Sequence, residues 1–506
     1  MKKKNKIVLA IVTLIIVTLI GCNREEFVEK IPMSEIPDMA FLNYLLMNFD
    51  TNRDGFISMK EANSIQEIDL REVGVASLKG IEYFTSLVKL IVGEVISRDA
   101  TVDLSNNLML EVLEVNYFDL SHFDISKNIN LKELSCSTLS KTLDLSNNIA
   151  LEKLVFFRSH LLETLDLSNH KRLRILSFTG TRLSVSSLNL NDYKYLEELY
   201  CVGTTVITDL SISNIPLRIL ACSNIQNLNL SNLPLKDLNC FNIRNLNISN
   251  LLDLESITLN HTSVPGDYLD LTNHIKLKNL VCGAGCNFRV DISKCTALEE
   301  LVWMNISQPI DISNNKALRF LLYRSENDVD ISNNTALETL DYTSESFSQT
   351  GKLLSIHNNT LLKNVRIVSS EGEKYDFSNN PLIENLNIQG QRNGTNREYT
   401  NEINIDNCRN LIELSIADCF LYTLDVRNKV KLKEVNISGC DSLSTINASN
   451  LQNLERFQVW NGQNANSVDA DFSNCRNLKE LQISPKEKSL NIRGCTSLNG
   501  WTSYPR

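Results

Sequence analysis

Two apolar phrases alternate along most of the chain. The first reads VDLSNN at residues 102–107, and its variants recur nineteen times, about 21 residues apart. The second reads Leu-x-x-Leu-x-Cys or a close variant, with apolar residues eight, eleven and thirteen positions after each start. Because apolar and polar residues alternate in both phrases, each phrase predicts a short strand with one face turned inwards. The copies start at residues 102, 123, 143, 165, 188, 210, 228, 246, 269, 290, 310, 329, 354, 375, 403, 424, 446, 470 and 490.

The polar end of the first phrase predicts a turn in every coil. Asparagine tolerates left-handed backbone and hydrogen-bonds its own main chain, so Ser-Asn-Asn suits such a turn. A single coil cannot bury both of its apolar edges, whereas stacked coils bury both. The pattern resembles the bacterial leucine-rich repeat, in which Leu-x-x-Leu-x-Cys alternates with Leu-Asp-Leu-Ser. The resemblance implies a mostly β solenoid over residues 69–506, with two short extended segments in each coil of about 21 residues.

Aspartate recurs at the second position of the first phrase, as in Asp103, Asp124 and Asp144. A column of stacked carboxylates can hold metal ions, or it can cap turns. Asn or Ser replaces the acid in eight copies, at residues 189, 211, 229, 247, 355, 404, 447 and 491. These replacements favour an outward, turn-capping position over a metal ladder.

Most of the thirteen cysteines also follow the repeat. They fall into an inward set in the second phrase and a set at the turn that ends the first phrase. We expect them to pack as small apolar side chains. Neighbouring thiols in register run parallel, which is poor geometry for a disulfide, although an oxidising export route leaves one or two bridges open. The inward set is Cys136, Cys201, Cys222, Cys240 and Cys282, and the turn set is Cys295, Cys408, Cys475 and Cys495.

Residues 50–61, DTNRDGFISMKE, fit the pattern D-x-[DN]-x-[DN]-G-x5-E without a mismatch. Apolar residues at helical spacing over 39–49, after Pro37 and Asp38, predict an entering helix, and residues 60–68 can form the exiting helix. The segment resembles an EF-hand, which implies a small helical cap over residues 37–68 that holds one Ca²⁺. An Asx-rich turn without metal is the alternative. The implied ligands are Asp50, Asn52, Asp54, Phe56 through its carbonyl, Ser58 and Glu61.

The first residues predict an export signal. A start rich in lysine precedes an apolar run over residues 7–20, which is too short to span a bilayer as a mature helix. The run ends in LIGC at residues 19–22, which resembles the lipobox of bacterial lipoproteins. The resemblance implies a signal peptide over 1–21, acylation of Cys22 and a tether over 22–36, although an ordinary signal peptide would also fit. Residues 23–26, NREE, resemble the signals that send Bacteroidetes lipoproteins to the outer face of the outer membrane, or they are a solvated tether.

Composition and motifs exclude several classes of function. A formal charge of −10 and the lack of a basic patch argue against nucleic acid as a partner. The six histidines show no metal-ligand spacing, and no nucleophile elbow, Walker loop or dinucleotide loop occurs. We therefore expect a monomer that is not an enzyme and that meets the membrane only through its lipid.

Any ligand is expected on the outward positions of the second strand. Most of these positions carry small or polar residues, and exposed aromatic residues and arginine are typical interface anchors. The resemblance implies a binding protein, adhesin-like, for an extracellular protein or glycan; a structural envelope spacer without a ligand is the alternative. The candidate contacts are Phe157, Tyr200, Phe241, Met304, Arg324, Arg366 and Trp460.

Overall fold

The computed structural model describes residues 29–93, 102–182, 189–203, 207–344, 354–369, 375–390, 403–462, 465–484, 487–499 and 501–503. The chain forms two compact units, residues 1–205 and residues 206–506, called here the N-terminal and C-terminal units. The predicted signal segment, Cys22 and the first part of the tether lie outside the described residues. Across the described ranges, no helix is both long and apolar enough to span a bilayer.

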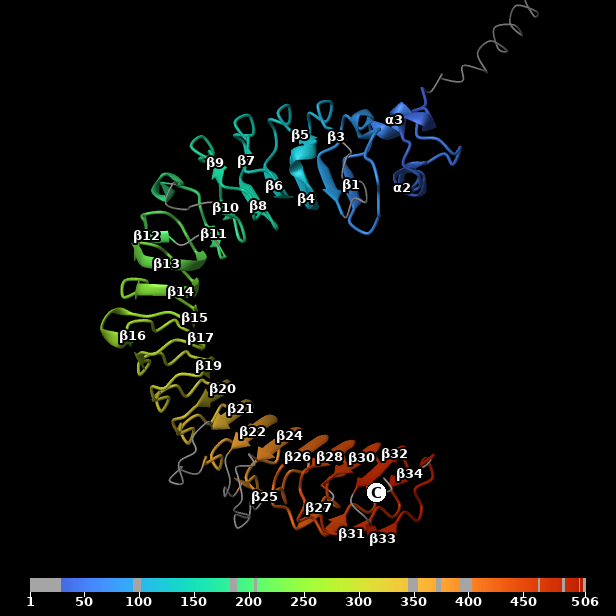
Figure 1. Cartoon of the computed structure of the whole chain (residues 1–506), viewed down its shortest axis with the longest axis vertical. Coiled ribbons are helices and arrows are strands. Elements are labelled where there is room, and N and C mark those ends of the chain that lie inside the picture. Colours follow the sequence, from blue (N-terminus) through green and yellow to red (C-terminus); the bar gives the residue numbers. More distant parts are fainter. Residues whose placement is uncertain are drawn as a thin grey trace, which may run out of the picture. The chain divides into compact units, whose positions relative to one another are not determined.

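The N-terminal unit begins with a helical cap and continues as stacked coils (Figure 1). The second phrases form one parallel ladder, and the first phrases form short pairs, β3 with β5 and β7 with β9. Its helices are η1 (Met33–Glu35), α2 (Met39–Phe49), α3 (Met59–Ala62), η2 (Ile81–Tyr83), η3 (Leu120–His122) and η5 (Leu190–Asp192). The ladder holds β1 (Glu67–Leu70), β2 (Lys89–Val92), β4 (Val112–Asp119), β6 (Glu133–Ser137), β8 (Lys153–Phe156), β10 (Ile175–Ser177) and β11 (Glu198–Cys201). The short strands are β3 (Val102–Asp103), β5 (Phe123–Asp124), β7 (Thr142–Leu143) and β9 (Thr164–Leu165).

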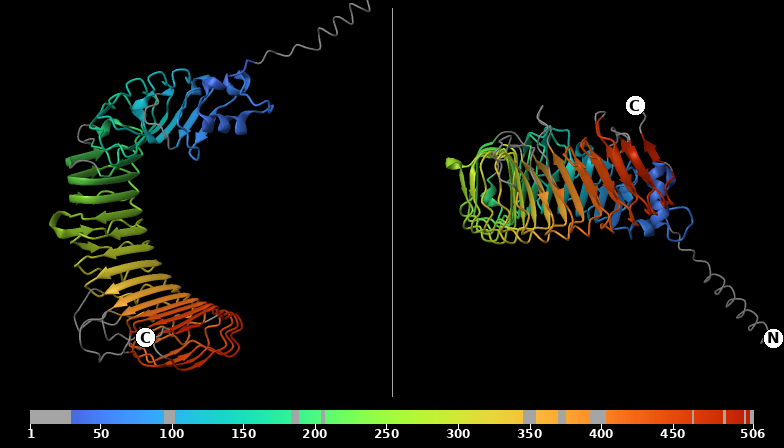
Figure 2. Two further views of the ribbon diagram at one scale, coloured as in Figure 1. Left: turned by 45° about the vertical axis from the view of Figure 1, so that its right-hand side comes forward. Right: turned by 90° about the horizontal axis from the view of Figure 1, so that it is seen from below.

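The C-terminal unit repeats the same coil, and Figure 2 shows its ladder strands side by side and pointing in one direction. Its one described 3₁₀ turn is η6 (Pro265–Asp267). The ladder holds β12 (Ile207–Ser213), β13 (Ile219–Ser231), β14 (Asp237–Asn247), β15 (Ser256–Asn260), β17 (Asn279–Cys282), β19 (Glu300–Met304), β20 (Phe320–Ser325), β21 (Thr339–Ser344), β22 (Asn364–Ser369), β24 (Asn385–Gly390), β26 (Glu413–Ala417), β28 (Glu434–Ser438), β30 (Arg456–Trp460), β32 (Glu480–Ser484) and β34 (Trp501–Ser503). The short strands are β16 (Tyr268–Asp270), β18 (Arg289–Asp291), β23 (Tyr375–Asp376), β25 (Ile403–Asn404), β27 (Thr423–Asp425), β29 (Thr445–Asn447), β31 (Val468–Asp471) and β33 (Glu487–Asn491).

Both units confirm the predicted mostly β solenoid with two extended segments in most coils. Leu134 of β6 lies opposite Leu154 of β8, and neither residue is exposed to solvent. The coils that start at 210 and 228 depart from the pattern, because they are shorter between the two phrases. There the second phrase of one coil joins the first phrase of the next coil, so that β13 and β14 run through both as continuous strands.

A ladder of buried asparagines, which sequence reasoning missed, holds consecutive coils together. The second Asn of the first phrase donates both amide hydrogens to carbonyls of the preceding coil. Asn334 Nδ2, for example, lies 3.0 Å from the Ile312 carbonyl oxygen and 2.9 Å from that of Asn315. The expectation that these asparagines bond their own main chain is therefore wrong, because the buried turn places the nearest free carbonyls in the neighbouring coil. The ladder asparagines are Asn107, Asn128, Asn148, Asn315, Asn334, Asn359 and Asn380.

The aspartate column caps turns, as predicted. Asp144 Oδ1 accepts the Ser146 amide hydrogen at 2.9 Å, and Asp291 Oδ1 accepts that of Ser293 at the same distance. These hydrogen bonds stabilise the ionised form and lower the pKa of both carboxyl groups.

The cysteines pack as free thiols, in agreement with the sequence interpretation. The inward set is buried, and the sulfurs of Cys222 and Cys240 lie 3.8 Å apart, within reach of a thiol hydrogen bond but with no disulfide between them. Cys295 and Cys475 occupy the ladder position of their coils, where each thiol donates to a carbonyl of the preceding coil, at 3.3 and 3.0 Å. A thiol can therefore replace the ladder asparagine with one donor instead of two.

The cap packs on the first coils of the N-terminal unit. Helix α2 has the predicted bounds, and the Asp38 side chain accepts the Phe41 amide hydrogen at its start. The other Asp38 oxygen accepts the Ala76 amide hydrogen at 2.6 Å, and the Phe41 ring lies 6.3 Å from that of Phe84. The exiting helix is shorter than predicted, because α3 ends at Ala62 and the chain must be extended again by β1.

Candidate functional site

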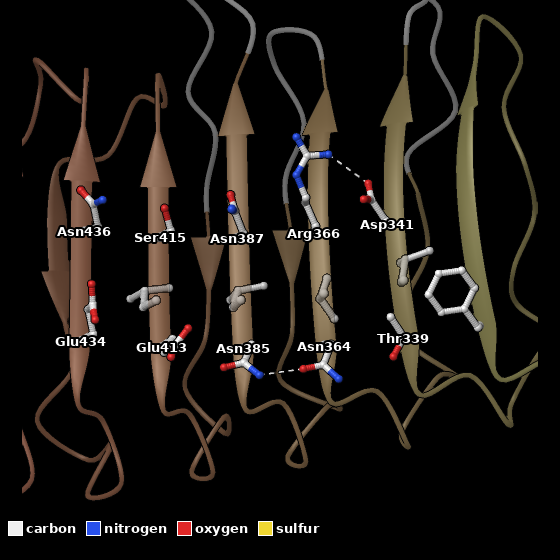
Figure 3. A pocket seen from close by; sticks show the side chains of 15 residues that line it. Thr339, Asp341, Asn364, Arg366, Asn385, Asn387, Glu413, Ser415, Glu434 and Asn436 are labelled. Carbon is white, nitrogen blue, oxygen red and sulfur yellow. Dashed lines mark hydrogen bonds and ion pairs between the residues drawn. The ribbon is translucent and has the colours of Figure 1, made fainter. Parts of the chain in front are cut away.

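An open hollow lies on the outward face of strands β20 to β28 in the C-terminal unit. Its volume is about 430 Å³. Residues alternate along these strands, so Leu340, Leu386 and their equivalents are buried and border the hollow from the core side, while their neighbours line it with polar side chains. Figure 3 shows the polar lining side chains in two rows across the strands. One row holds Thr339, Asn364, Asn385, Glu413 and Glu434, and the other holds Asp341, Arg366, Asn387, Ser415 and Asn436.

The hollow exists because small side chains occupy consecutive strands. Asn387 on β24 and Ser415 on β26 are short and are followed on β28 by Asn436, whereas β20, at the other end of the hollow, contributes Phe320. Within the first row, Asn385 Nδ2 donates to Asn364 Oδ1 at 2.7 Å, which fixes the orientation of both amides. The floor therefore presents oriented amide groups, which can both donate and accept hydrogen bonds.

Charge in the hollow is mainly negative. Its lining includes three carboxylates, on Asp341, Glu413 and Glu434, and the guanidinium of Arg366. Arg366 pairs with Asp341 at 3.0 Å, and Glu434 pairs with Arg456 at 3.2 Å. Across the part of the chain that the structure describes, Glu413 forms no ion pair. This carboxylate is exposed and available to a cationic group of a ligand.

The structure describes all seven predicted contact residues, and one of them lines the hollow. Arg324 and Arg366 come together, because both approach Asp341, at 3.7 and 3.0 Å, but only Arg366 lines the hollow. Tyr200 is half-buried on β11, with its hydroxyl 2.9 Å from a Glu198 oxygen, and Met304 is half-buried on β19. Exposure is about 40% for the three remaining aromatic residues, and Phe241 packs edge-on against His261 with ring centroids 5.3 Å apart. These three are Phe157, Phe241 and Trp460.

The sequence signal for the hollow was a run of short polar residues at corresponding outward positions. The sequence prediction named the largest outward side chains as ligand contacts. It therefore missed Asn385, Asn387 and Ser415, because a depression forms where side chains are small. Neighbouring coils that share small outward residues, next to one with an aromatic residue, are the pattern that would have found it.

The predicted calcium loop adopts a tight turn that brings its oxygens and amides together. Asp50 Oδ2 accepts the Gly55 amide hydrogen at 2.9 Å, and Asn52 Oδ1 accepts that of Asp54 at 2.9 Å. Asp54 Oδ1 accepts the Phe56 amide hydrogen at 3.0 Å. Gly55 has φ of 81°, a conformation that glycine adopts without strain.

Glu61, at the end of the loop, is held by four hydrogen bonds. Oε1 accepts from the Thr51 amide and hydroxyl at 2.8 and 2.7 Å, and Oε2 accepts from the Ser58 amide and hydroxyl at 3.0 and 2.8 Å. Burial raises the pKa of Glu61, but the hydrogen bonds from Ser58 and Thr51 outweigh burial and bring the pKa to about 2. This carboxylate is therefore ionised at neutral pH.

The loop residues fit a hard divalent cation in their chemistry and backbone. Every candidate donor is an oxygen, and Asp50, Asp54 and Glu61 are carboxylates. Throughout the described ranges, however, no three His, Cys, Asp or Glu side chains gather as a metal cluster. In this loop Thr51 and Ser58 occupy the Glu61 oxygens, and Lys30 lies 2.7 Å from Asp54 Oδ2. A bound Ca²⁺ would replace some of these partners and supply charge neutralisation.

No protein-family model matches the chain, and no curated protein does. Solved structures do show likeness in fold. The functional domain of InlJ from Listeria monocytogenes, described as including a cysteine ladder, is 21% identical over 70% of this chain and 79% of its own, with a TM-score of 0.47. A leucine-rich repeat protein of Leptospira interrogans is 15% identical over 81% of this chain and 93% of its own, with a TM-score of 0.43. The internalin InlF of Listeria monocytogenes is 16% identical over 82% and 98%, with a TM-score of 0.37.

The chain has the fold of a leucine-rich repeat solenoid. At these identities the likeness concerns the fold and not a ligand.

Proposed function

We propose that the chain is a recognition protein that binds its ligand on the strand face of the C-terminal unit. The hollow over β20 to β28 carries this proposal. Its polar side chains are oriented by the sheet, and the chain leaves them open to solvent. Neither feature is needed to stack the coils, which depend on the leucines on the buried side of the strands and on the buried asparagines of the turns. We propose no catalytic role, and we expect the protein to act as a monomer.

We propose an extracellular protein as the ligand in preference to a glycan. The hollow combines amide donors and acceptors with an acidic balance, which suits an extended peptide that carries a basic side chain. Glu413 is the expected partner of that side chain. The peptide backbone would bond the amides of Asn387 and Asn436, which lie in the same row.

We further propose that acylation of Cys22 anchors the protein to the outer membrane, with the solenoid on the extracellular side. The LIGC sequence at 19–22 supports the anchor, and NREE at 23–26 supports the outward orientation. Labelling with a radioactive fatty acid tests the anchor: the unchanged chain should be labelled and the Cys22→Ala chain should not. Accessibility to protease on intact cells tests the orientation.

We propose that one Ca²⁺ binds the loop at residues 50–61 and braces the cap. The oxygen-only donor set and the ionised Glu61 support this proposal. The cap contacts the first coil through Phe41 and Asp38, so a stiffer loop would stabilise the open end of the solenoid.

The test of recognition is an array of extracellular proteins and glycans probed with the full chain, with and without calcium. The variant Asn387→Trp places a bulky side chain in the hollow and should abolish binding to the ligand found. The matched control is Gln389→Trp, which lies two residues further along the same strand, is also exposed and does not line the hollow. If both variants bind as the unchanged chain does, the hollow is not the site. A flat array would favour the alternative, a structural envelope spacer.

A further inference from the structure

The calcium loop is paired with the chain's own tether. The sequence holds no second loop of the same pattern. Instead, the Ile31 amide donates to the Ile57 carbonyl at 2.9 Å, and the Met59 amide donates to the Glu29 carbonyl at 2.7 Å. Lys30 and Ser58 thus form an antiparallel bridge, with Ile31 and Ile57 buried beneath it. Residues 29–31, called here the strap, are fixed against the second half of the loop.

The strap carries a positive charge to the loop. The Lys30 ammonium lies 2.7 Å from Asp54 Oδ2 and 4.3 Å from the centre of the Phe56 ring. Asp54 is the middle acid of the predicted ligand set, and its other oxygen accepts the Phe56 amide hydrogen. Both oxygens of Asp54 are therefore engaged, one of them by a cation from the chain itself.

We propose that Lys30 is an internal competitor that lowers the affinity of the loop for Ca²⁺. This inference rests on the proposed calcium site. A divalent cation that takes Asp54 must displace a present partner, and it meets the positive charge of Lys30 at short range. The strap cannot move away freely, because its two backbone hydrogen bonds and the buried Ile31 hold it. Lys30 consequently raises the calcium concentration that is needed to fill the loop.

The experiment is calorimetric titration of the full chain in detergent with Ca²⁺. The variant Lys30→Met keeps an unbranched stem over Phe56 and leaves the backbone bridge intact, and it removes only the ammonium. We expect its dissociation constant for Ca²⁺ to fall about two- to fivefold, the range of an exposed ion pair. The matched control is Lys60→Met, because Lys60 is an exposed lysine of the same loop, whereas the ion pair of Asp54 is made by Lys30. Glu61→Gln identifies the site, and it should lose the binding event.

The outcomes separate this inference from the proposal on which it rests. If neither the unchanged chain nor Lys30→Met binds Ca²⁺, the calcium site itself is wrong. If the unchanged chain binds, Glu61→Gln does not, and Lys30→Met binds with unchanged affinity, the site stands and the competition by Lys30 is overturned. An equal gain in Lys60→Met would also overturn it, because the effect would then be one of general charge.

Discussion

Replacing one ladder asparagine should lower the stability of the solenoid by several kcal/mol, and the loss should be confined to the coils next to the substitution. Asn334 is fully buried and donates to the Ile312 and Asn315 carbonyls at 3.0 and 2.9 Å. Asn334→Ala leaves both carbonyls without their donor inside the core. An unsatisfied buried polar group costs about 1–3 kcal/mol, so we expect a loss of about 2–5 kcal/mol. Asn334→Cys should lose less, because a thiol at the same position donates one hydrogen bond in the coil of Cys295.

Hydrogen exchange of backbone amides measures this loss where it occurs. In a repeat protein each coil contacts only its neighbours, so amides of β21 should exchange faster while those of β32 should not change. Asn333→Ala is the matched control, because Asn333 precedes Asn334 in the same turn and is exposed. The reasoning is refuted if Asn334→Ala costs less than about 0.5 kcal/mol, the usual range of surface substitutions, or no more than Asn333→Ala.

Two further predictions follow from buried ionisable groups. Burial raises the pKa of Cys295 to about 12 and that of Cys475 to about 11, so both should resist iodoacetamide at pH 8 in the native chain, and half-buried Cys495 should react first. Mass spectrometry checks this, and rapid labelling of Cys295 would contradict its packing. The pKa of Glu61 lies below its usual 4.5, at about 2, so its ion contributes stability to the cap above pH 4.5 that is lost as the pH falls toward 2. The contribution is about 3 kcal/mol. Urea unfolding should therefore show that the free energies of unfolding of Glu61→Gln and of the unchanged chain converge as the pH falls from 5 to 2. A difference in free energy of the same size at pH 2 would contradict the prediction.

The sequence was sufficient to predict the solenoid, the cap helix and the turn caps, because each depends on local chemistry. Alternation of apolar and polar residues places Leu134 on the buried face of its strand. Asp38 caps the start of α2, and Asp144 caps its turn by accepting the amide hydrogen of the residue two positions later. The exiting helix was predicted too long, since residues 60–68 have helical propensity but β1 must pair with β2 from Glu67 onward. Tertiary pairing overrode local preference there.

The asparagine ladder could not be derived from a single coil. Asn334 donates to carbonyls that belong to the preceding coil. When one turn is considered alone, the main chain of that turn is the only partner available to the asparagine. The register between coils determines which carbonyls the asparagine can reach, and that register follows from the stacked apolar positions. The cysteines at the same position support this account, because Cys295 and Cys475 each donate to the preceding coil and not to their own.

The candidate site shows why the size of a single outward side chain does not predict where a hollow forms on the face of a sheet. A large outward residue such as Trp460 or Phe157 increases local exposure, but it stands on the sheet and encloses nothing by itself. The hollow forms where short side chains follow one another across neighbouring strands, as Asn387, Ser415 and Asn436 do on β24, β26 and β28. Because the strands are in register, one short residue per coil at the same offset produces a continuous groove floor. If the proposed function is right, the length of such a run, and not the presence of any single aromatic residue, should determine how much of the ligand the hollow can contact.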